Sequence, residues 1–472
     1  MAYSYQKCDS FGTQQLVFWI SIKLPGLNQK AYQQEITVED FVAIAHKEVL
    51  NKLPNIDESL SQTEAKSLLS ALGLLGSSVE RHAQQNFVRQ QLTLVKLRLK
   101  QEPTAVQPGL GLKLLQVNSQ SFTNYFSQLA RFIGHPNRDS FASFVEFNGA
   151  AIRVRHPQTK ETICLMPPLI TQGKWLTFTE QQAEIDFLSL LKKSFALQKS
   201  ANYFLEQIQD PNIDLASDEA ISCVSNAANL MRAVAVEIAY FMANSQFDSD
   251  FFLDYLRQYA CVWSQENYLK PPSGANDYAS LERDLILFKE LIPPIGKFPG
   301  YHRHVRSVFS VLMPHEIKKL KLAMSQDSIE AKIYHKLGLN RQQINRLSER
   351  EALHLLTENP WLAAYNQLYS AQKEQSHIHY SSIKKYLIRP KRIRDSNRDS
   401  REKVTVVSNQ YGTTGMNPLG IVKIIDRARA NHPLNNLTRT KNLTQESKKL
   451  AMALGITFLS RKKLSSLCSL DS

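Results

Sequence analysis

The pattern of apolar and polar positions changes along the chain near residue 180. From about Glu180 onward, apolar residues recur every three or four positions, the spacing typical of helices that bury one face. The predicted helices span 180–208, 217–243, 248–263, 278–292, 302–324, 341–358, 360–388 and 416–430. This part of the chain is therefore expected to be all helical.

The region before residue 180 has a mixed pattern. Thr37-Val-Glu-Asp40 matches a capping box that opens a helix. Helical patterns then cover about 60–75 and 78–100, and Gly76 predicts a break between them.

Two short apolar segments flank Asn148-Gly149, a dipeptide typical of two-residue hairpin turns. This arrangement predicts a hairpin near 144–154, and Thr162–Leu165 could supply a third strand. The expected fold class is therefore mainly α, with a small N-terminal α+β domain followed by a larger all-helical domain.

Charge and composition divide the chain into three parts. We expect the mixed domain in 1–205, the helical domain in 206–430 with a mobile charged loop at 389–409, and a basic C-terminal extension in 431–472. From residue 380 to the end there are 19 Lys and Arg against 6 Asp and Glu, while the rest holds 38 against 37. The extension is interpreted first as solvated chain, and second as a weak contact for an acidic surface, either nucleic acid or anionic lipid.

Composition excludes several classes of protein. No apolar run reaches the roughly 20 residues needed to span a bilayer, and the N-terminus lacks the pattern of a signal peptide. The five cysteines are scattered without a CxxC pair, which argues against a disulfide framework or a zinc site. A soluble cytoplasmic enzyme is expected. The cysteines are Cys8, Cys164, Cys223, Cys261 and Cys468.

The segment 360–387 carries a histidine on its apolar stripe. His379 shares this stripe with Leu368, Ile383 and Tyr386, whereas His377 lies about 200° away around the helix and should face solvent. A histidine on a buried stripe is more often a hydrogen-bonded structural residue than a metal ligand. From spacing alone, both interpretations of His379 stay open.

The surrounding residues resemble the indoleamine 2,3-dioxygenase superfamily of haem proteins. In that family the proximal histidine is followed by a Lys-Tyr-(Ile/Leu) ending, a variable loop and a Gly-Thr-Gly-Gly turn before a helix. Here Lys385-Tyr386-Leu387, the 389–409 loop and Gly412-Thr413-Thr414-Gly415 occur in the same order. The resemblance implies haem b with His379 as the iron ligand, and it implies that Gly412, Thr413, Thr414 and Gly415 contact the cofactor or substrate.

Further segments follow the order of the family's distal pocket. Asn229–Ala239 resembles its long distal helix, and Phe252 and Arg257 lie in a segment resembling the helix with a pocket phenylalanine and an arginine. The resemblance implies that Phe252 contacts the haem pocket, that Arg257 binds the substrate carboxylate, and that Ser273 lies over the distal face, with Asp284 eleven residues on. A buried guanidinium suits a carboxylate, but an ion pair with a neighbouring helix would explain Arg257 equally well.

The sequence also departs from the family pattern. Ala233 replaces a distal serine, Ser376 replaces an arginine that serves a haem propionate, and Thr414 replaces a glycine. These changes favour the divergent branch that includes the pyrrolnitrin-pathway enzyme, which rearranges a chlorinated tryptophan ring. The resemblance covers roughly residues 205–430.

The resemblance implies haem-dependent oxidation of tryptophan or a related indole by O₂, with ring cleavage or rearrangement as the outcome. Arg257 and Ser273 would act on the substrate in the distal pocket. Two alternatives remain: a haem-binding sensor or sink without turnover, and a nucleic-acid or membrane-surface module that acts through the basic extension.

Overall fold

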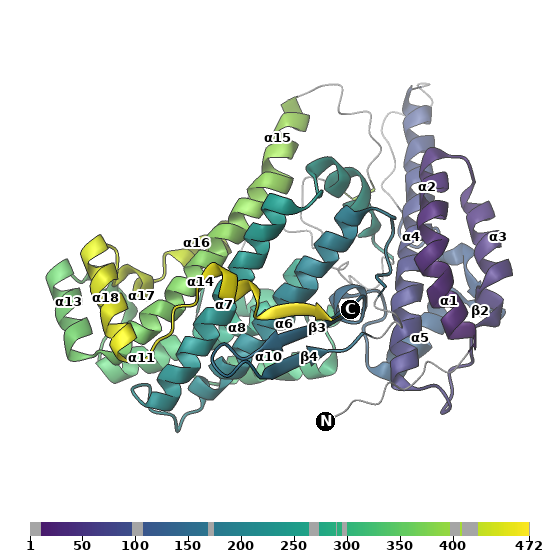
Figure 1. The fold of residues 1–472 in the computed structure, drawn as a ribbon. Coiled ribbons are helices and arrows are strands. Elements are labelled where there is room, and N and C mark those ends of the chain that lie inside the picture. Colours follow the sequence, from purple (N-terminus) through teal and green to yellow (C-terminus); the bar gives the residue numbers. More distant parts are fainter. Residues whose placement is uncertain are drawn as a thin grey trace.

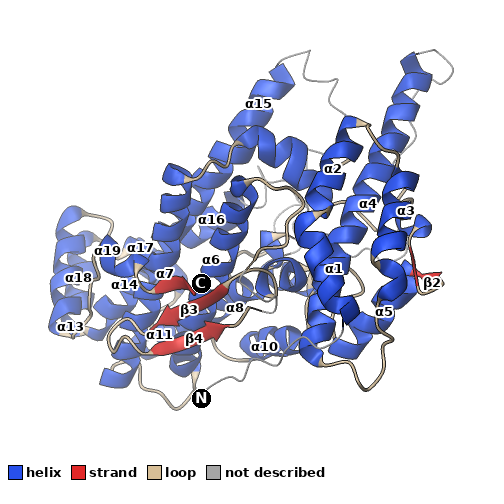
Figure 2. Cartoon of the chain, turned by 45° about the vertical axis from the view of Figure 1, so that its right-hand side comes forward, coloured by secondary structure: helices blue, strands red, loops and turns tan. Residues whose placement is uncertain are grey.

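The computed structural model describes residues 11–96, 107–168, 174–263, 273–288, 290–294, 300–396, 406–407 and 423–471. Over these residues the protein is mainly helical with one small three-stranded sheet, which confirms the mainly α part of the predicted fold class (Figures 1 and 2). An N-terminal bundle stands beside a larger helical body (Figure 1). None of the helices in these ranges is both long and apolar enough to cross a membrane.

The N-terminal bundle is all helical apart from one short strand pair. The predicted capping box is confirmed, because Thr37 Oγ accepts from Asp40 N at 3.0 Å while Thr37 N donates to the Asp40 carboxylate at 3.1 Å. The elements of the bundle are α1 (Phe11–Ile22), α2 (Leu24–Gln33), α3 (Val38–Glu48), η1 (Leu50–Lys52), α4 (Gln62–Lys96), η2 (Leu112–Leu114), β1 (Gln116–Val117), β2 (Gln120–Ser121) and α5 (Phe122–Ile133).

The predicted break at Gly76 is wrong, because α4 runs through it. A Cβ atom at Gly76 would lie 3.0 Å from ring atoms of Phe122 and Trp263. The glycine therefore allows two aromatic rings to pack closely on an unbroken helix.

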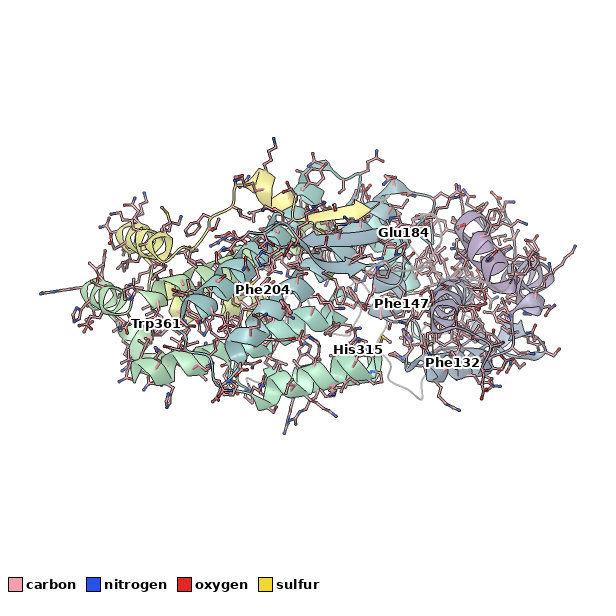
Figure 3. All side chains as sticks on the ribbon, turned by 60° about the horizontal axis from the view of Figure 1, so that its bottom comes forward. Phe132, Phe147, Glu184, Phe204, His315 and Trp361 are labelled. Carbon is pink, nitrogen blue, oxygen red and sulfur yellow. The ribbon has the colours of Figure 1, made fainter. Side chains whose placement is uncertain are left out.

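Four helices form the centre of the larger body: α6 (Gln182–Gln209), α7 (Asp218–Asn244), α8 (Tyr278–Leu287) and α14 (Trp361–Ile383). Helix α6 packs on α7 and α8, and α7 packs on α14. The predicted domain boundary at residue 205 falls inside α6. Figure 3 shows the side chains of both parts, with Phe132 labelled in the bundle and Phe204 and Trp361 labelled in the body.

Three predicted helices of the body are divided in the structure. Residues 248–263 form a π-helical turn, η5 (Phe251–Tyr255), and a 3₁₀ turn, η6 (Leu256–Tyr259). An extended stretch before Pro314 interrupts 302–324, and a new capping box at Ser348 interrupts 341–358. The resulting elements are α9 (Tyr301–Arg306), η8 (Phe309–Val311), α10 (Pro314–Ser325), α12 (Arg341–Arg346) and α13 (Glu349–Glu358), with α11 (Ile329–Leu337) between them.

The predicted hairpin near 144–154 is also wrong. Residues Ala142–Glu146 form a π-helical turn, η3, and Asn148 bonds Leu176 through both its amide oxygen (2.9 Å) and its amide nitrogen (2.7 Å). Strand β3 (Ala151–Arg155) instead pairs antiparallel with β4 (Thr162–Met166), which confirms the third predicted strand.

Residues 431–471 pack onto the body, contrary to the expectation of a solvated extension. Strand β5 (Cys468–Asp471) pairs with β3, so the sheet order is β4-β3-β5. Helix α18 (Lys441–Ala453) packs on α14. The remaining elements near this end are η9 (Lys384–Ile388), α15 (Arg389–Ser396), α16 (Lys423–Ala430), α17 (Pro433–Asn436) and α19 (Arg461–Ser465). A short 3₁₀ turn, η7 (Gly274–Asn276), precedes α8.

Candidate functional site

His379 lies near the C-terminal end of α14, where the buried stripe of the helix reaches the surface. Ser376, one turn earlier, is buried, whereas 46% of the His379 side chain is exposed. His377 faces solvent, as the helical geometry predicts. His379 Nδ1 lies 3.0 Å from Oδ2 of Asp426, which is buried on α16.

This contact fixes the protonation of the ring. Burial raises the pKa of Asp426, but His379 and Arg429 lower it more, so the net pKa lies below the ordinary value. The carboxylate is therefore ionised at neutral pH and can only accept hydrogen bonds. Nδ1 must carry the proton, and in neutral imidazole this leaves a lone pair on Nε2.

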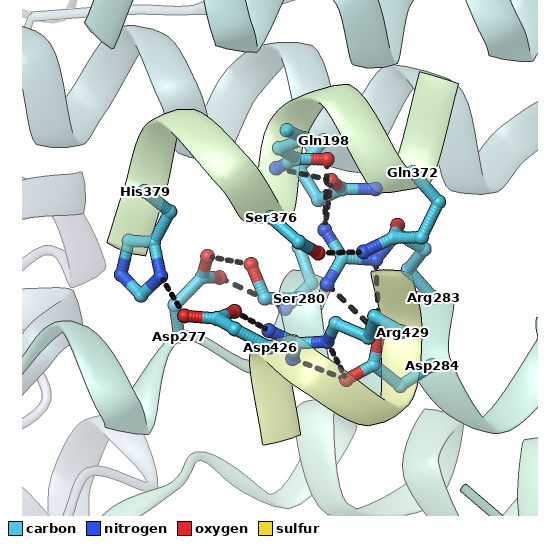
Figure 4. A network of polar contacts seen from close by, with 12 residues as sticks. Gln198, Asp277, Ser280, Arg283, Asp284, Gln372, Ser376, His379, Asp426 and Arg429 are labelled. Carbon is cyan, nitrogen blue, oxygen red and sulfur yellow. Dashed lines mark hydrogen bonds and ion pairs between the residues drawn. The ribbon is translucent and has the colours of Figure 1, made fainter. Parts of the chain in front are cut away.

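Asp426 is itself held by a buried network of charges (Figure 4). Arg429 Nη1 donates to Asp426 Oδ1 at 3.0 Å, because these two residues are three apart on α16. Arg429 also pairs with the fully buried Asp284, whose second oxygen accepts from Arg283 at 2.8 Å. Two carboxylates and two guanidiniums make the network neutral, so each buried charge has an opposite partner.

The network joins several helices around His379. Burial lowers the pKa of Arg429, but Asp284 and other neighbours raise it more, so the guanidinium stays charged. Arg283 Nη1 donates to Gln198 on α6 at 2.8 Å and to Gln375 on α14 at 3.1 Å. The elements α6, α8, α14 and α16 are therefore tied together one turn from His379.

A separate cavity is lined by three of the residues that the sequence predicts for the distal pocket. Phe252, Arg257 and Ser273 all line it, which brings together three residues that the sequence places up to 21 positions apart. Its volume is about 150 Å³, a size at which an apolar cavity in another protein admits one benzene ring. The other lining residues are Asp139, Phe141, Phe144, Val145, Phe178, Phe187, Leu191, Leu256, Tyr259, Ala260 and Gly274.

Arg257 gives this largely aromatic cavity a positive charge. Its side chain is only 3% exposed, and burial lowers its pKa to about 10, so the guanidinium remains charged at neutral pH. Phe178 and Tyr259 stack on one wall, with ring centroids 4.0 Å apart and planes 5° apart. The cavity can therefore hold a flat aromatic ring beside a carboxylate.

The cavity and His379 are neighbours but distinct. Among the described residues, the cavity lining includes Arg257 and does not include His379. Leu191 of the lining and Gln198 of the network lie seven residues apart on one face of α6, about 10 Å along its axis. The cavity is smaller than a porphyrin, and Phe252 lines it together with Arg257 and Ser273.

Other predicted contacts are placed differently. Ala233 is buried on α7, which packs directly against α14: Arg232 donates to the Gln367 carbonyl at 3.2 Å and pairs with Glu374 at 3.5 Å. This leaves Ala233 in the core and away from the cavity. Gly412, Thr413, Thr414 and Gly415 lie outside the described residues. Asp284 lies in the charged network described above.

One part of the loop after α14 does reach the cavity region. The backbone amides of Val406 and Val407 donate to Gln258 Oε1 at 2.8 and 2.9 Å. Gln258 directly follows Arg257 and is buried. The chain between α14 and α16 therefore passes beside the residue that charges the cavity.

Sequence reasoning missed Asp426 and Arg429. Both fall in the predicted helix 416–430, and their opposite charges at a spacing of three were the available signal. That signal does not reveal that they face His379. Within the described ranges, no three or more His, Cys, Asp or Glu side chains gather as ligands for a bare metal ion.

No protein-family model matches this chain, and no curated protein sequence matches it significantly. The resemblance to the indoleamine 2,3-dioxygenase superfamily therefore stays a prediction from the motifs quoted above.

Proposed function

We propose that this protein is a haem-dependent oxidoreductase that acts on tryptophan or a related indole, with His379 as the iron ligand. The observation that carries the proposal is the His379–Asp426 contact. It directs the proton to Nδ1 and leaves Nε2, on a side chain that is 46% exposed, available to a metal. Histidine ligands commonly donate their second ring nitrogen to a carboxylate in this manner.

The His379 imidazole with its Asp426 partner therefore suits haem b. The haem would activate O₂ for ring cleavage or rearrangement. Arg257 would bind the substrate carboxylate through two charge-assisted hydrogen bonds. Phe178 and Tyr259 would orient the indole and exclude water from it. Ser273 would offer a hydroxyl at the same cavity.

The first test is the absorption spectrum of the full chain loaded with haem, compared with His379→Ala and His377→Ala. His377 is the matched control because it lies two residues away on the same helix and faces solvent. We expect a Soret band that weakens or shifts only in His379→Ala. Absence of a Soret band in the wild type, or equal effects of both substitutions, would overturn the proposal.

A second candidate is a haem-binding protein without turnover. It is favoured by the separation of the cavity from His379. Titration of tryptophan into the haem-loaded protein distinguishes the two functions. A substrate-induced shift of the Soret band supports the enzyme, because the indole must then lie close to the haem. Tryptophan binding without a spectral shift supports the second candidate.

A further inference from the structure

We infer that Asp426 is a positioning residue that holds His379 in its Nδ1–H tautomer and makes the ring an electron-rich ligand. This inference rests on the proposed function for its consequence at the iron. The tautomer itself is a property of the haem-free chain. Sequence resemblance does not assign any role to Asp426.

The contact between His379 and Asp426 joins α14 to α16. Its Nδ1–Oδ2 distance is 3.0 Å, and the two residues are 47 positions apart in sequence. Asp426 is 4% exposed, so little water competes for its oxygens. An ionised carboxylate in such a setting accepts a hydrogen bond strongly and favours the Nδ1–H form.

The Asp426 carboxylate cannot easily turn away from His379. Its other oxygen accepts from Arg429 at 3.0 Å, and Arg429 is anchored on the fully buried Asp284. Tyr301 and Arg283 also donate to Asp284. The carboxylate is therefore fixed at both oxygens, and the direction of the His379 ring is fixed with it (Figure 4).

A carboxylate partner also changes the electron density of the His379 ring. A carboxylate at Nδ1 draws the proton toward itself and increases the electron density at Nε2, whereas a neutral acceptor does so less. An electron-rich axial ligand stabilises the ferric over the ferrous form. The buried charge network would thus lower the reduction potential of the bound iron.

The test begins with the haem-free protein. Ring-¹⁵N-histidine labelling and NMR report the tautomer of each histidine, and the spectrum of His379→Gln identifies the His379 signals. We expect wild-type His379 to be protonated at Nδ1, and Asp426→Asn to shift the population toward Nε2–H. Asp426→Glu should restore the wild-type pattern.

Asp277→Asn is the matched control. Asp277 is a nearby acidic residue that caps α8, bonding Ala279 N at 2.9 Å and Ser280 Oγ at 2.7 Å, and no contact to His379 is present among the described residues. Asn is an equally good cap, so this substitution should leave the His379 signals unchanged. An equal shift in both variants would overturn the inference.

The haem-loaded proteins supply the second readout. Asp426→Asn should raise the reduction potential of the iron and move the Fe–His stretching band to lower wavenumber, while Asp277→Asn should do neither. If Asp426→Asn fails to fold, the wild-type spectrum still decides, because a dominant Nε2–H tautomer would overturn the inference.

Failure of this inference is distinguishable from failure of the proposed function. A wild-type Soret band with an Nε2–H tautomer leaves the haem function intact and refutes the role of Asp426. An Nδ1–H tautomer that depends on Asp426, without a Soret band, supports the positioning role and refutes the haem function.

Discussion

Arg257 is the residue whose replacement tests the substrate cavity most directly. Its pKa of about 10 lies three units above neutral pH, so only about one guanidinium in a thousand is uncharged there. Replacement by Leu removes the charge and leaves a shorter, apolar side chain. Replacement by Lys keeps a charge but removes the planar pair of donors.

The expected magnitude follows from the loss of two charge-assisted hydrogen bonds in a buried setting. Each is worth about 1.5–3 kcal/mol, so a total of about 3 kcal/mol is a conservative estimate for Arg257→Leu. This corresponds to a rise in the Kd of tryptophan of roughly a hundredfold. Arg257→Lys should lose about one of the two bonds, or roughly a tenfold rise in Kd.

Tryptamine provides the control ligand, because it carries the same indole ring and amine without a carboxylate. Its Kd should stay within about twofold in both variants, since the aromatic walls of the cavity are unchanged. Isothermal titration calorimetry gives the Kd of each ligand for each variant relative to that for the wild type, which makes four ratios. Equal weakening for tryptophan and tryptamine would show that Arg257 shapes the cavity and does not bind a carboxylate.

The remaining predictions concern stability, measured by chemical denaturation. Asp284→Asn should lower the free energy of unfolding by about 3–5 kcal/mol, because it leaves a buried excess of positive charge; a loss below about 1 kcal/mol would contradict this. Burial lowers the pKa of His135 to about 4. The unfolded chain therefore binds a proton at this histidine first as the pH falls below 6.5. At pH 5 the free energy of unfolding of the wild type should be about 2 kcal/mol lower than at neutral pH, and His135→Gln should not show this loss. Gly76→Ala should lower the free energy of unfolding by about 1–3 kcal/mol, because the added methyl group crowds Phe122. Gly26 on α2 has open space around it, so Gly26→Ala should raise the free energy of unfolding by up to about 1 kcal/mol.

The central helices could be predicted from the sequence because their apolar spacing is long and regular. The predicted 180–208 and 217–243 match α6 and α7 within two residues at each end. Local signals also explain one error. Pro314 disfavours a helical conformation at the preceding residue, so the division of 302–324 could have been predicted.

The hairpin error has a tertiary cause. Asn148-Gly149 has the composition of a tight turn, but the Asn148 amide is engaged by the backbone of Leu176 and Gly149 lies against Trp175. Strand β3 finds its second partner at Cys468–Asp471, more than 300 residues away. Neither contact can be derived from the local pattern.

The candidate site could be predicted only in part for the same reason. Phe252, Arg257 and Ser273 meet at one cavity. Asp426 could not be predicted as a site residue, because α16 follows a variable loop whose path the sequence does not define. The apolar spacing predicts His379 on the buried stripe of α14, whereas 46% of its side chain is exposed. The local pattern does not indicate its partner Asp426.

Described residues of the C-terminal fifth of the chain complete this site, and the basic residues among them belong to a folded surface. Asn366 of α14 donates to the Leu434 carbonyl at 2.7 Å, and its own amide oxygen accepts from Ser447 at 3.0 Å. His432 is fully buried and pairs with Glu330 at 2.9 Å. The two Asn366 contacts hold α14 directly. Deletion of 431–472 would therefore disturb His379 as well as remove basic residues, and it cannot separate binding to acidic surfaces from haem binding. Charge reversal of the exposed Lys462 and Lys463 on α19 would isolate the surface effect, because neither side chain contacts the site.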